Sequence, residues 1–264
     1  MKKDPHGTKL GVPAVSSRLR AFTPARVGLG RTGVSQQARD VLTFQLAHAQ
    51  ARDAVRARID ASALHAAIAA QSPTATVLRL HSAASDRAAF LQRPDLGRQL
   101  DENSRRLLES FNGSGCDLAI IVADGLSALA VERHVPALLG ELLPRLAQGS
   151  MGPICIVEQG RVAIGDEIGF ALRADISVVL IGERPGLSSP DSLGAYITWQ
   201  PRPGRSDAER NCISNIRSEG LTYSEAAAQL VSCLVTARQR RLTGTAMDQQ
   251  RAILPEGNGT GGQP

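Results

Sequence analysis

Three apolar runs, separated by segments of helical length, constrain the fold of this chain most strongly. They cover residues 117–124, 154–157 and 176–181, and a fourth run covers 195–199. Strands that are apolar at consecutive positions are buried on both faces, as in parallel sheets. Helical patterns accompany them at 126–146, 165–172 and 224–241. This alternation predicts an α/β fold, with a Rossmann-like parallel sheet from about residue 115 onward.

The residues before this sheet favour helices. Residues 35–58 carry apolar side chains at helical spacing, and Ser35 is the expected N-cap. A second helical pattern covers 61–70, and shorter ones cover 86–91 and 96–109. An N-terminal helical segment should therefore precede the sheet.

These patterns divide the chain into four parts. We expect a helical N-terminal region at 22–112 and an α/β domain at 113–242. The first 21 residues lack periodicity, and residues 243–264 are rich in Gly, Gln and Pro. Such composition is typical of disordered tails.

Composition excludes several classes of function. No apolar run approaches 18 residues, so a membrane span is not predicted. Aromatic residues make up only 3% of the chain, too few for stacking platforms that bind nucleic acid. The basic excess lies at the N-terminus, where residues 1–60 hold 11 basic and 4 acidic side chains. Without a nucleic-acid motif, this segment fits an acidic protein surface better.

The positions of lysine and cysteine exclude further chemistry. All three lysines precede residue 10, so neither a Schiff-base lysine nor a phosphate-binding P-loop lysine is available in the folded body. The four cysteines are widely spaced and contain no C-x-x-C pair. We therefore predict no metal site and interpret most of these thiols as buried in a reducing compartment.

The loop after the third apolar run combines side chains that a simple connection does not need. Glu183, Arg184, Pro185 and Gly186 follow residues 176–181 directly. In parallel α/β sheets, ligands bind at the carboxyl ends of the strands, where this loop should lie. A surface turn closed by a salt bridge remains the alternative.

Two glycine-containing segments allow competing interpretations. The segment Asp124-Gly125-Leu126-Ser127 either forms a turn with Ser127 as an N-cap or offers a helix N-terminus to a polar ligand. The glycines at 28, 30 and 33 match G-x-G-x-x-G. No convincing strand precedes them, so they predict a tight turn rather than a dinucleotide site.

The residues alone do not decide the function of three further segments. Residues 160–167 read most simply as a loop with apolar anchors. Cys212 lies among short polar residues typical of a structured loop, and an ordinary buried thiol would explain it. Among the histidines, His81 is the better candidate for function because Ser82 and Asp86 are close in sequence.

Colinear motifs between about residues 22 and 240 carry a family resemblance. They comprise Thr23-Pro24-Ala25-Arg26, residues 44–55, His81-Ser82-Ala83-Ala84, Arg93-Pro94-Asp95-Leu96-Gly97, Ala123-Asp124-Gly125-Leu126-Ser127, residues 181–186 and residues 212–216. In this order they resemble the small (light) subunit of ethanolamine ammonia-lyase. Agreement over that span is far more specific than any single motif.

The resemblance implies a function and a set of residues. It implies an adenosylcobalamin-dependent carbon–nitrogen lyase that converts ethanolamine to acetaldehyde and ammonia. Val162, Glu183 and Cys212 match the family's small-subunit cobalamin contacts, and no catalytic residue is carried over to this chain. The substrate site would lie in the large subunit, a TIM barrel, in a hetero-oligomer with six of each chain. The resemblance also implies a cytoplasmic location and is compatible with residence in a bacterial microcompartment.

Two interpretations from other classes compete with this one. A non-catalytic adaptor or regulatory module without a cofactor would account for the basic N-terminal segment. A free-standing nucleotide binder is disfavoured because the glycine motif lacks its strand. An activity that depends on both cobalamin and a large subunit would distinguish the family function from both.

Overall fold

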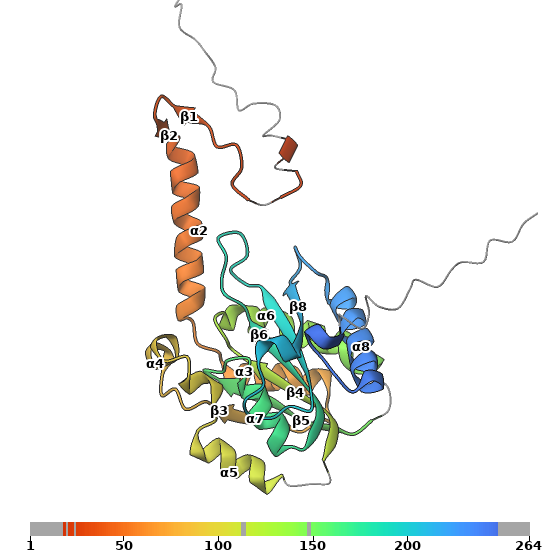
Figure 1. Ribbon diagram of the computed structural model, residues 1–264. Helices are drawn as coiled ribbons and strands as arrows, with labels where there is room; N and C mark the ends of the chain where they lie inside the picture. The colour runs from red at the N-terminus through yellow and green to blue at the C-terminus, as the bar shows by residue number, and fades with distance from the viewer. Residues whose placement is uncertain (1–17, 20, 24, 112–114, 147–148, 248–264) are drawn as a thin grey trace, which may run out of the picture.

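A six-stranded sheet forms the centre of the molecule in the computed structural model, which describes residues 18–19, 21–23, 25–111, 115–146 and 149–247 (Figure 1). The strand order is β3-β5-β4-β6-β7-β8. The bounds are β3 Val77–His81, β4 Cys116–Ala123, β5 Met151–Glu158, β6 Ala174–Gly182, β7 Leu193–Trp199 and β8 Arg210–Ile216. The predicted α/β class is confirmed.

The continuous apolar runs form the middle of this sheet. β4 pairs in parallel with β5 on one side and with β6 on the other. Its residues 119–123 are inaccessible to solvent, since both faces of the strand are covered. Burial on both faces explains why these runs do not alternate with polar residues.

The other half of the sheet departs from the prediction. β7 runs antiparallel to β6, and β8 runs antiparallel to β7. A loop of ten residues, 183–192, joins β6 to β7, and such a connection suits antiparallel neighbours. The sheet is therefore mixed, and the Cys212 segment is a strand rather than the expected loop.

A strand from the predicted helical region completes the sheet. β3 pairs in parallel with β5 at the opposite edge from β8. Leu78 and Leu80 are buried while Arg79 between them is exposed, as befits an edge strand. The sheet thus begins well before residue 113.

Helices cover both faces of the sheet. One face packs against α3 (Ala61–Gln71), α6 (Ala128–Leu142) and α8 (Tyr223–Arg240). The other packs against α5 (Glu102–Ser110) and α7 (Ile164–Ala171). Pro136 lies inside α6 without ending the helix. Short elements complete the body: α4 Arg87–Gln92, η1 Leu96–Arg98, η2 Leu143–Arg145 and η3 Asp207–Glu209.

A buried ion pair fixes α7 against the edge of the sheet. The Arg210 guanidinium donates to both carboxylate oxygens of Asp166, each at 2.6 Å. Both side chains are almost completely buried. Removing one partner of such a pair would leave an uncompensated charge in the interior.

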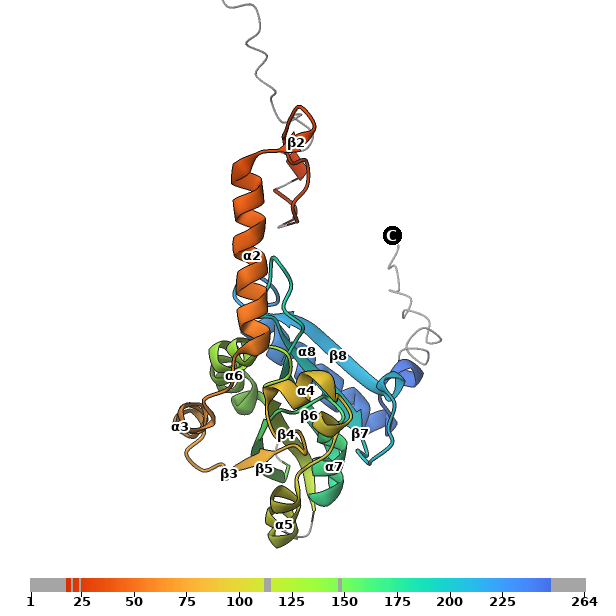
Figure 2. The same cartoon turned by 90° about the vertical axis from the view of Figure 1, so that its left-hand side faces the viewer.

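The chain before α3 forms an arm that projects from the body (Figures 1 and 2). This N-terminal arm comprises β1 Arg31–Thr32, β2 Ser35–Gln36 and α2 Ala38–Arg56. Ser35 therefore lies in a short hairpin, and Gln37 rather than Ser35 precedes the helix. Gly33, with φ of 63°, forms the turn of this hairpin, as predicted for a tight turn.

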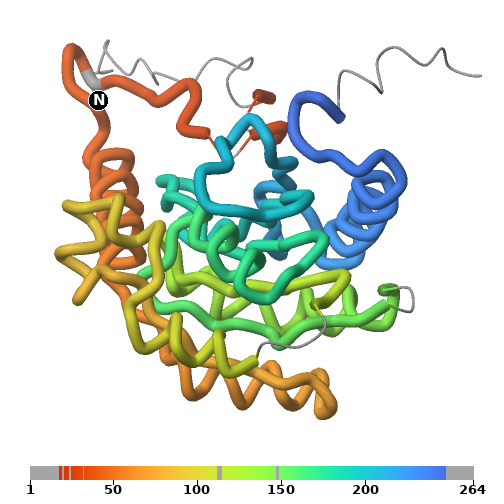
Figure 3. The backbone as a smooth tube through the Cα atoms, turned by 60° about the horizontal axis from the view of Figure 1, so that its bottom comes forward, coloured from red at the N-terminus to blue at the C-terminus, as the bar shows by residue number. Residues whose placement is uncertain are grey.

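The arm and α8 lie on opposite sides of the molecule (Figure 3). Residues 243–247, which the composition assigned to a C-terminal tail, pack against the body: the Thr243 hydroxyl accepts from Trp199 N at 2.9 Å, and Met247 is buried. Residues 248–264 and most of the predicted N-terminal tail, 1–17 and 20, lie outside the described residues. No helix in the described ranges is long and apolar enough to cross a membrane.

Candidate functional site

A crevice opens at the carboxyl ends of β4, β5 and β6. Its volume is about 390 Å³. Loops that follow the three strands contribute most of its lining. The lining residues are Gly125, Leu126, Arg161, Val162, Ile181, Gly182, Glu183, Arg184 and Tyr196. This is the position predicted for ligand binding in an α/β sheet.

The turn after β4 packs tightly on the end of β6. Gly125 has φ of 54°, and a Cβ placed on it would lie 2.3 Å from Gly182 O. Ser127 is the N-cap of α6, where its hydroxyl accepts from Ala130 N at 3.3 Å and donates to Pro190 O at 2.9 Å. The turn-and-cap interpretation of this segment is confirmed, while Gly125 and Leu126 also line the crevice.

Asp124 is a buried carboxyl behind this turn. One oxygen accepts from Gly160 N at 3.0 Å, and the other lies 3.4 Å from Arg87 Nη1. Burial raises the pKa of the Asp124 carboxyl to about 6, and the charge of Arg87 opposes this shift.

Arg87 ties four parts of the chain together at the same point. Its Nη1 donates to Gly125 O at 2.8 Å and to the Gln159 side chain at 3.3 Å. Its Nε donates to Val55 O at the end of α2. Burial lowers the pKa of Arg87, and Asp124 offsets part of this effect. Its Nη2 has no hydrogen-bond partner among the described residues.

The loop after β5 presents Arg161 and Val162 to the crevice. The Arg161 guanidinium lies 4.1 Å from the centroid of the Phe90 ring, and its Nη2 donates to Phe90 O at 3.1 Å. Arg161 Nε is buried and has no hydrogen-bond partner among the described residues. Val162 is half-buried beside it. An apolar group and a cation therefore stand side by side at this wall.

On the other side of the crevice, Glu183 connects its own loop, residues 183–192, to the end of β8. Its carboxylate accepts from the Ser192 hydroxyl and from Asn215 N, the latter at 3.3 Å. No ion pair of Glu183 occurs within the described part of the chain, so the salt-bridged turn is not observed. The carboxylate is half-buried at the crevice wall and keeps acceptor capacity.

Cys212 lies on β8, two strands beyond β6, the strand that Glu183 follows. It is the cross-strand partner of Tyr196, whose ring lines the crevice, and the thiol and the phenol are hydrogen-bonded. Burial raises the pKa of Cys212, so this thiol is not an activated thiolate. Cys212 is nevertheless exposed at the sheet edge rather than buried in the core. Val162 and Glu183 thus line one hollow, and Cys212 is linked to it through Tyr196.

His81 does not belong to this arrangement. Its Nδ1 lies 2.7 Å from Ser82 O, and Asp86 accepts from Ala89 N as the N-cap of α4. Sequence reasoning missed Arg87 and Tyr196, which act on the crevice through long-range contacts. Their strand and helix positions carry no local motif. No group of three or more His, Cys, Asp or Glu in the described ranges could hold a metal ion.

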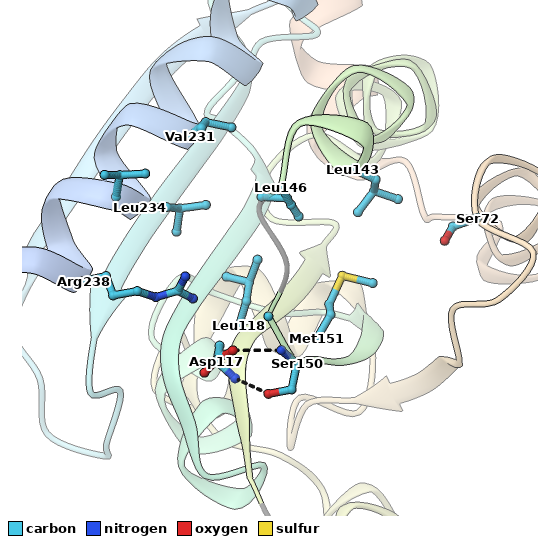
Figure 4. Close-up of a pocket in the computed structure, with 12 residues that line it drawn as sticks. Ser72, Asp117, Leu118, Leu143, Leu146, Ser150, Met151, Val231, Leu234 and Arg238 are labelled. Atoms are coloured by element: carbon cyan, nitrogen blue, oxygen red, sulfur yellow. Dashed lines mark hydrogen bonds between the residues drawn. The ribbon is translucent and has the colours of Figure 1, made fainter.

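A second cavity, of about 350 Å³, lies at the opposite ends of the strands (Figure 4). Its walls are mostly apolar and include Leu118, Leu143 and Leu234. Asp117 and Ser150 at the starts of β4 and β5 bond each other there, with Ser150 N donating to Asp117 at 2.8 Å. These polar groups satisfy each other, so the cavity offers less chemistry than the crevice.

Comparison with known proteins defines the family. The family model for Ethanolamine ammonia-lyase light chain (EutC) matches residues 14–248. A small subunit of ethanolamine ammonia-lyase from Pseudomonas aeruginosa strain LESB58 is 55% identical over 240 residues, covering 89% of this chain and 87% of the relative. The corresponding protein of Xanthomonas campestris pv. campestris strain B100 is 53% identical over 240 residues, with the same coverage.

A third relative extends the match along the chain. The small subunit from Azotobacter vinelandii is 52% identical over 250 residues and covers 92% of each chain. The chain belongs to the ethanolamine ammonia-lyase light-chain family. The predicted resemblance is confirmed. This light chain is therefore a lyase subunit by family, and the crevice is its candidate site.

The buried carboxyl predicts a pH dependence of stability. The pKa of Asp124 rises from its ordinary value of 3.8 to about 6 on folding, so its contribution to stability is complete below pH 3.8 and is lost as pH rises through 6. Replacing Asp124 by Asn removes this dependence. We expect the free energy of unfolding of Asp124→Asn, relative to the unmodified chain, to increase by about 2 to 3 kcal/mol between about pH 4 and pH 7. Urea unfolding at several pH values measures it.

The matched control is Asp53→Asn, which alters an exposed carboxyl on α2. The difference in free energy of unfolding between Asp53→Asn and the unmodified chain should stay constant over the same pH range. An equally flat difference for Asp124→Asn would contradict the assignment of a raised pKa.

Proposed function

We propose that this light chain completes the adenosylcobalamin pocket of ethanolamine ammonia-lyase together with a large subunit. In this role it serves the conversion of ethanolamine to acetaldehyde and ammonia. The proposal extends to the assembly implied by the resemblance, with six of each chain in a cytoplasmic complex. The names of the relatives support a partner chain, because each is a small subunit.

The observation that carries the proposal is the pairing of Val162 and Glu183 in one crevice at the carboxyl ends of the strands. Cobalamin has a broad apolar face and neutral amide side arms. Val162 can contact the former, and the Glu183 carboxylate can accept from the latter. Arg161 and Arg184, which line the same crevice, can further donate to a polar ligand. The residues present therefore fit the cofactor.

The residues of this chain and the cofactor would have different roles in the reaction. When bound, adenosylcobalamin supplies the radical chemistry of the reaction. The residues of this chain bind, orient and exclude water, since the crevice holds no activated nucleophile beside a base. Tyr196 has a pKa raised mainly by burial, so its phenol stays protonated and can donate a hydrogen bond. We therefore assign no catalytic residue to this chain.

The alternative of an adaptor module without a cofactor has one structural feature in its favour. The N-terminal arm exposes Leu42, Phe44 and Leu46 on α2. Such a surface suits a protein partner. However, an assembled lyase also needs a partner surface, whereas an adaptor has no use for the polar crevice.

Reconstitution tests the proposed function. We expect the purified light chain alone to release no ammonia from ethanolamine, and the complex with the large subunit to do so only when adenosylcobalamin is added. The control is the large subunit with the cofactor but without this chain. Ammonia release by the rigorously purified light chain alone, or no cofactor dependence in the complex, would sink the proposal.

Removing the Glu183 charge should weaken cofactor binding more than folding. A hydrogen bond to a charged group contributes about 1.5–3 kcal/mol, so Glu183→Gln should raise the half-saturating adenosylcobalamin concentration about ten- to a hundred-fold. The measurement is a cofactor titration of the assembled complex. Glu141→Gln, which alters an exposed glutamate on α6, is the control. An unchanged titration for Glu183→Gln would count against this contact.

Cys212 should report the presence of cofactor by its accessibility. We expect bound cobalamin to shield this exposed thiol from alkylation, while Cys212→Ser keeps substantial activity at saturating cofactor because the thiol makes a packing contact. Mass spectrometry of the complex with and without cobalamin measures the labelling. Cys116 at the start of β4, which is half-buried and lies at the strand ends opposite the crevice, serves as the internal control. Equal labelling of Cys212 in both states would remove it from the cofactor site.

A further inference from the structure

Three arginines at the crevice lack an acidic partner. Arg161 and Arg184 line the crevice itself, and Arg98 lines a hollow of about 330 Å³ that continues from it past Arg161 and Val162. Within the described residues none of the three forms an ion pair, whereas Arg205 at the same rim pairs with Glu209. In the described ranges, the carboxylates of Glu183 in the crevice and Asp207 in the adjoining hollow form no ion pair with these arginines, and Asp207 pairs with Arg210 instead. The three arginines therefore leave an excess of positive charge there.

Arg161 is the centre of this group, which we call the crevice arginines: Arg98, Arg161 and Arg184. Its pKa is lowered, first by burial and then by repulsion from Arg87 and from the other two crevice arginines. Stacking on Phe90 holds its guanidinium in place, and the buried Nε remains without a partner among the described residues. Arg161 is thus a fixed cation at the wall that the crevice and the adjoining hollow share.

This arrangement is unfavourable unless an anion balances it. Like charges at close range repel most strongly where burial reduces the effective dielectric constant. A guanidinium offers planar donors that match the oxygens of a phosphate group. An anion in the hollow would pair with the Arg161 guanidinium and relieve the repulsion among the crevice arginines.

We propose that the crevice arginines, with Arg161 at their centre, bind the phosphodiester of the cobalamin nucleotide loop. This inference rests on the proposed function. The phosphodiester is an anionic group, whereas the side arms of the corrin ring are neutral amides. Glu183 can accept from the amides while the arginines donate to the phosphate. The Arg161 guanidinium after β5 and the Glu183 carboxylate after β6 then fix the direction in which the cofactor enters the crevice.

An acidic residue of the large subunit is the competing occupant. The phosphate is favoured because Arg161, the central cation, is half-buried and lines both the crevice and the adjoining hollow. Arg161 and Arg184 are also the chain neighbours of Val162 and Glu183, so they line the same crevice as the residues assigned to the cofactor.

Two corrinoids that differ only in a phosphate group test the proposal. Cobinamide lacks the nucleotide loop, and cobinamide phosphate carries a phosphate at the start of that loop. Equilibrium dialysis of the assembled complex, read by corrin absorbance, gives the dissociation constant of each. We expect the unmodified complex to bind cobinamide phosphate at least about tenfold more tightly. Arg161→Gln should bring this ratio close to one while leaving cobinamide binding nearly unchanged.

A second variant and a control guard against effects on folding. Arg184→Gln alters an exposed side chain and should reduce the same ratio about threefold or more. Arg106→Gln on α5, where the arginine is exposed and pairs with Glu102, should keep the full ratio. Higher salt should reduce the ratio of the unmodified complex because it screens the arginines.

The failures of the two proposals are distinguishable. An unmodified complex that binds neither adenosylcobalamin nor either corrinoid would overturn the proposed function and this inference with it. Equal affinity for both corrinoids would overturn this inference alone, as would an unchanged ratio in Arg161→Gln and Arg184→Gln. If Arg161→Gln lowered the affinity for both corrinoids by the same factor, Arg161 would have a structural role. Weaker subunit association with an unchanged ratio would assign the arginines to an acidic surface of the large subunit.

Discussion

The buried pair of Arg87 and Asp124 is the interaction on which the architecture of the crevice depends. Asp124 ends β4 and fixes Gly160 N after β5, while Arg87 on α4 reaches Gly125 O and the end of α2. Desolvating two charges is costly, and only multiple hydrogen bonds offset this cost. Here those bonds join four segments that are distant in sequence. The pair therefore sets where the crevice walls stand as well as contributing to stability.

Much of the fold could be predicted because it follows from continuous apolar runs. β4, β5 and β6 are buried on both faces and show this directly in the sequence. β7 and β8 could not be oriented in the same way, since strand direction depends on the length of the connection and on pairing. β8 was mistaken for a loop because its short polar residues lie on an exposed edge, with only its two ends buried. β3 was similarly hidden in a region dominated by helical patterns.

The candidate site was predictable to a smaller extent, and for a different reason. The loop after β6 was indicated by its mixture of residues at a strand end, but the roles of Val162 and Cys212 came only from the family resemblance. Arg87 and Tyr196 were missed because their functions arise from contacts between distant segments. Arg161 on Phe90 illustrates the same point, since neither residue is unusual in its local sequence. Local sequence reveals what a residue can do, whereas tertiary contacts decide where it does so.

The crevice is built from one side only, and this has a consequence for assembly. Most of its lining comes from the loops after three strands, and Arg184 at its wall is exposed to the surroundings. A polar ligand held there would remain partly in water, where charged contacts are weakened by the high dielectric constant. A partner that covers the open side would strengthen the same contacts without changing any residue of this chain. Cofactor binding and subunit association should therefore favour each other, because each removes water from the charges that the other needs.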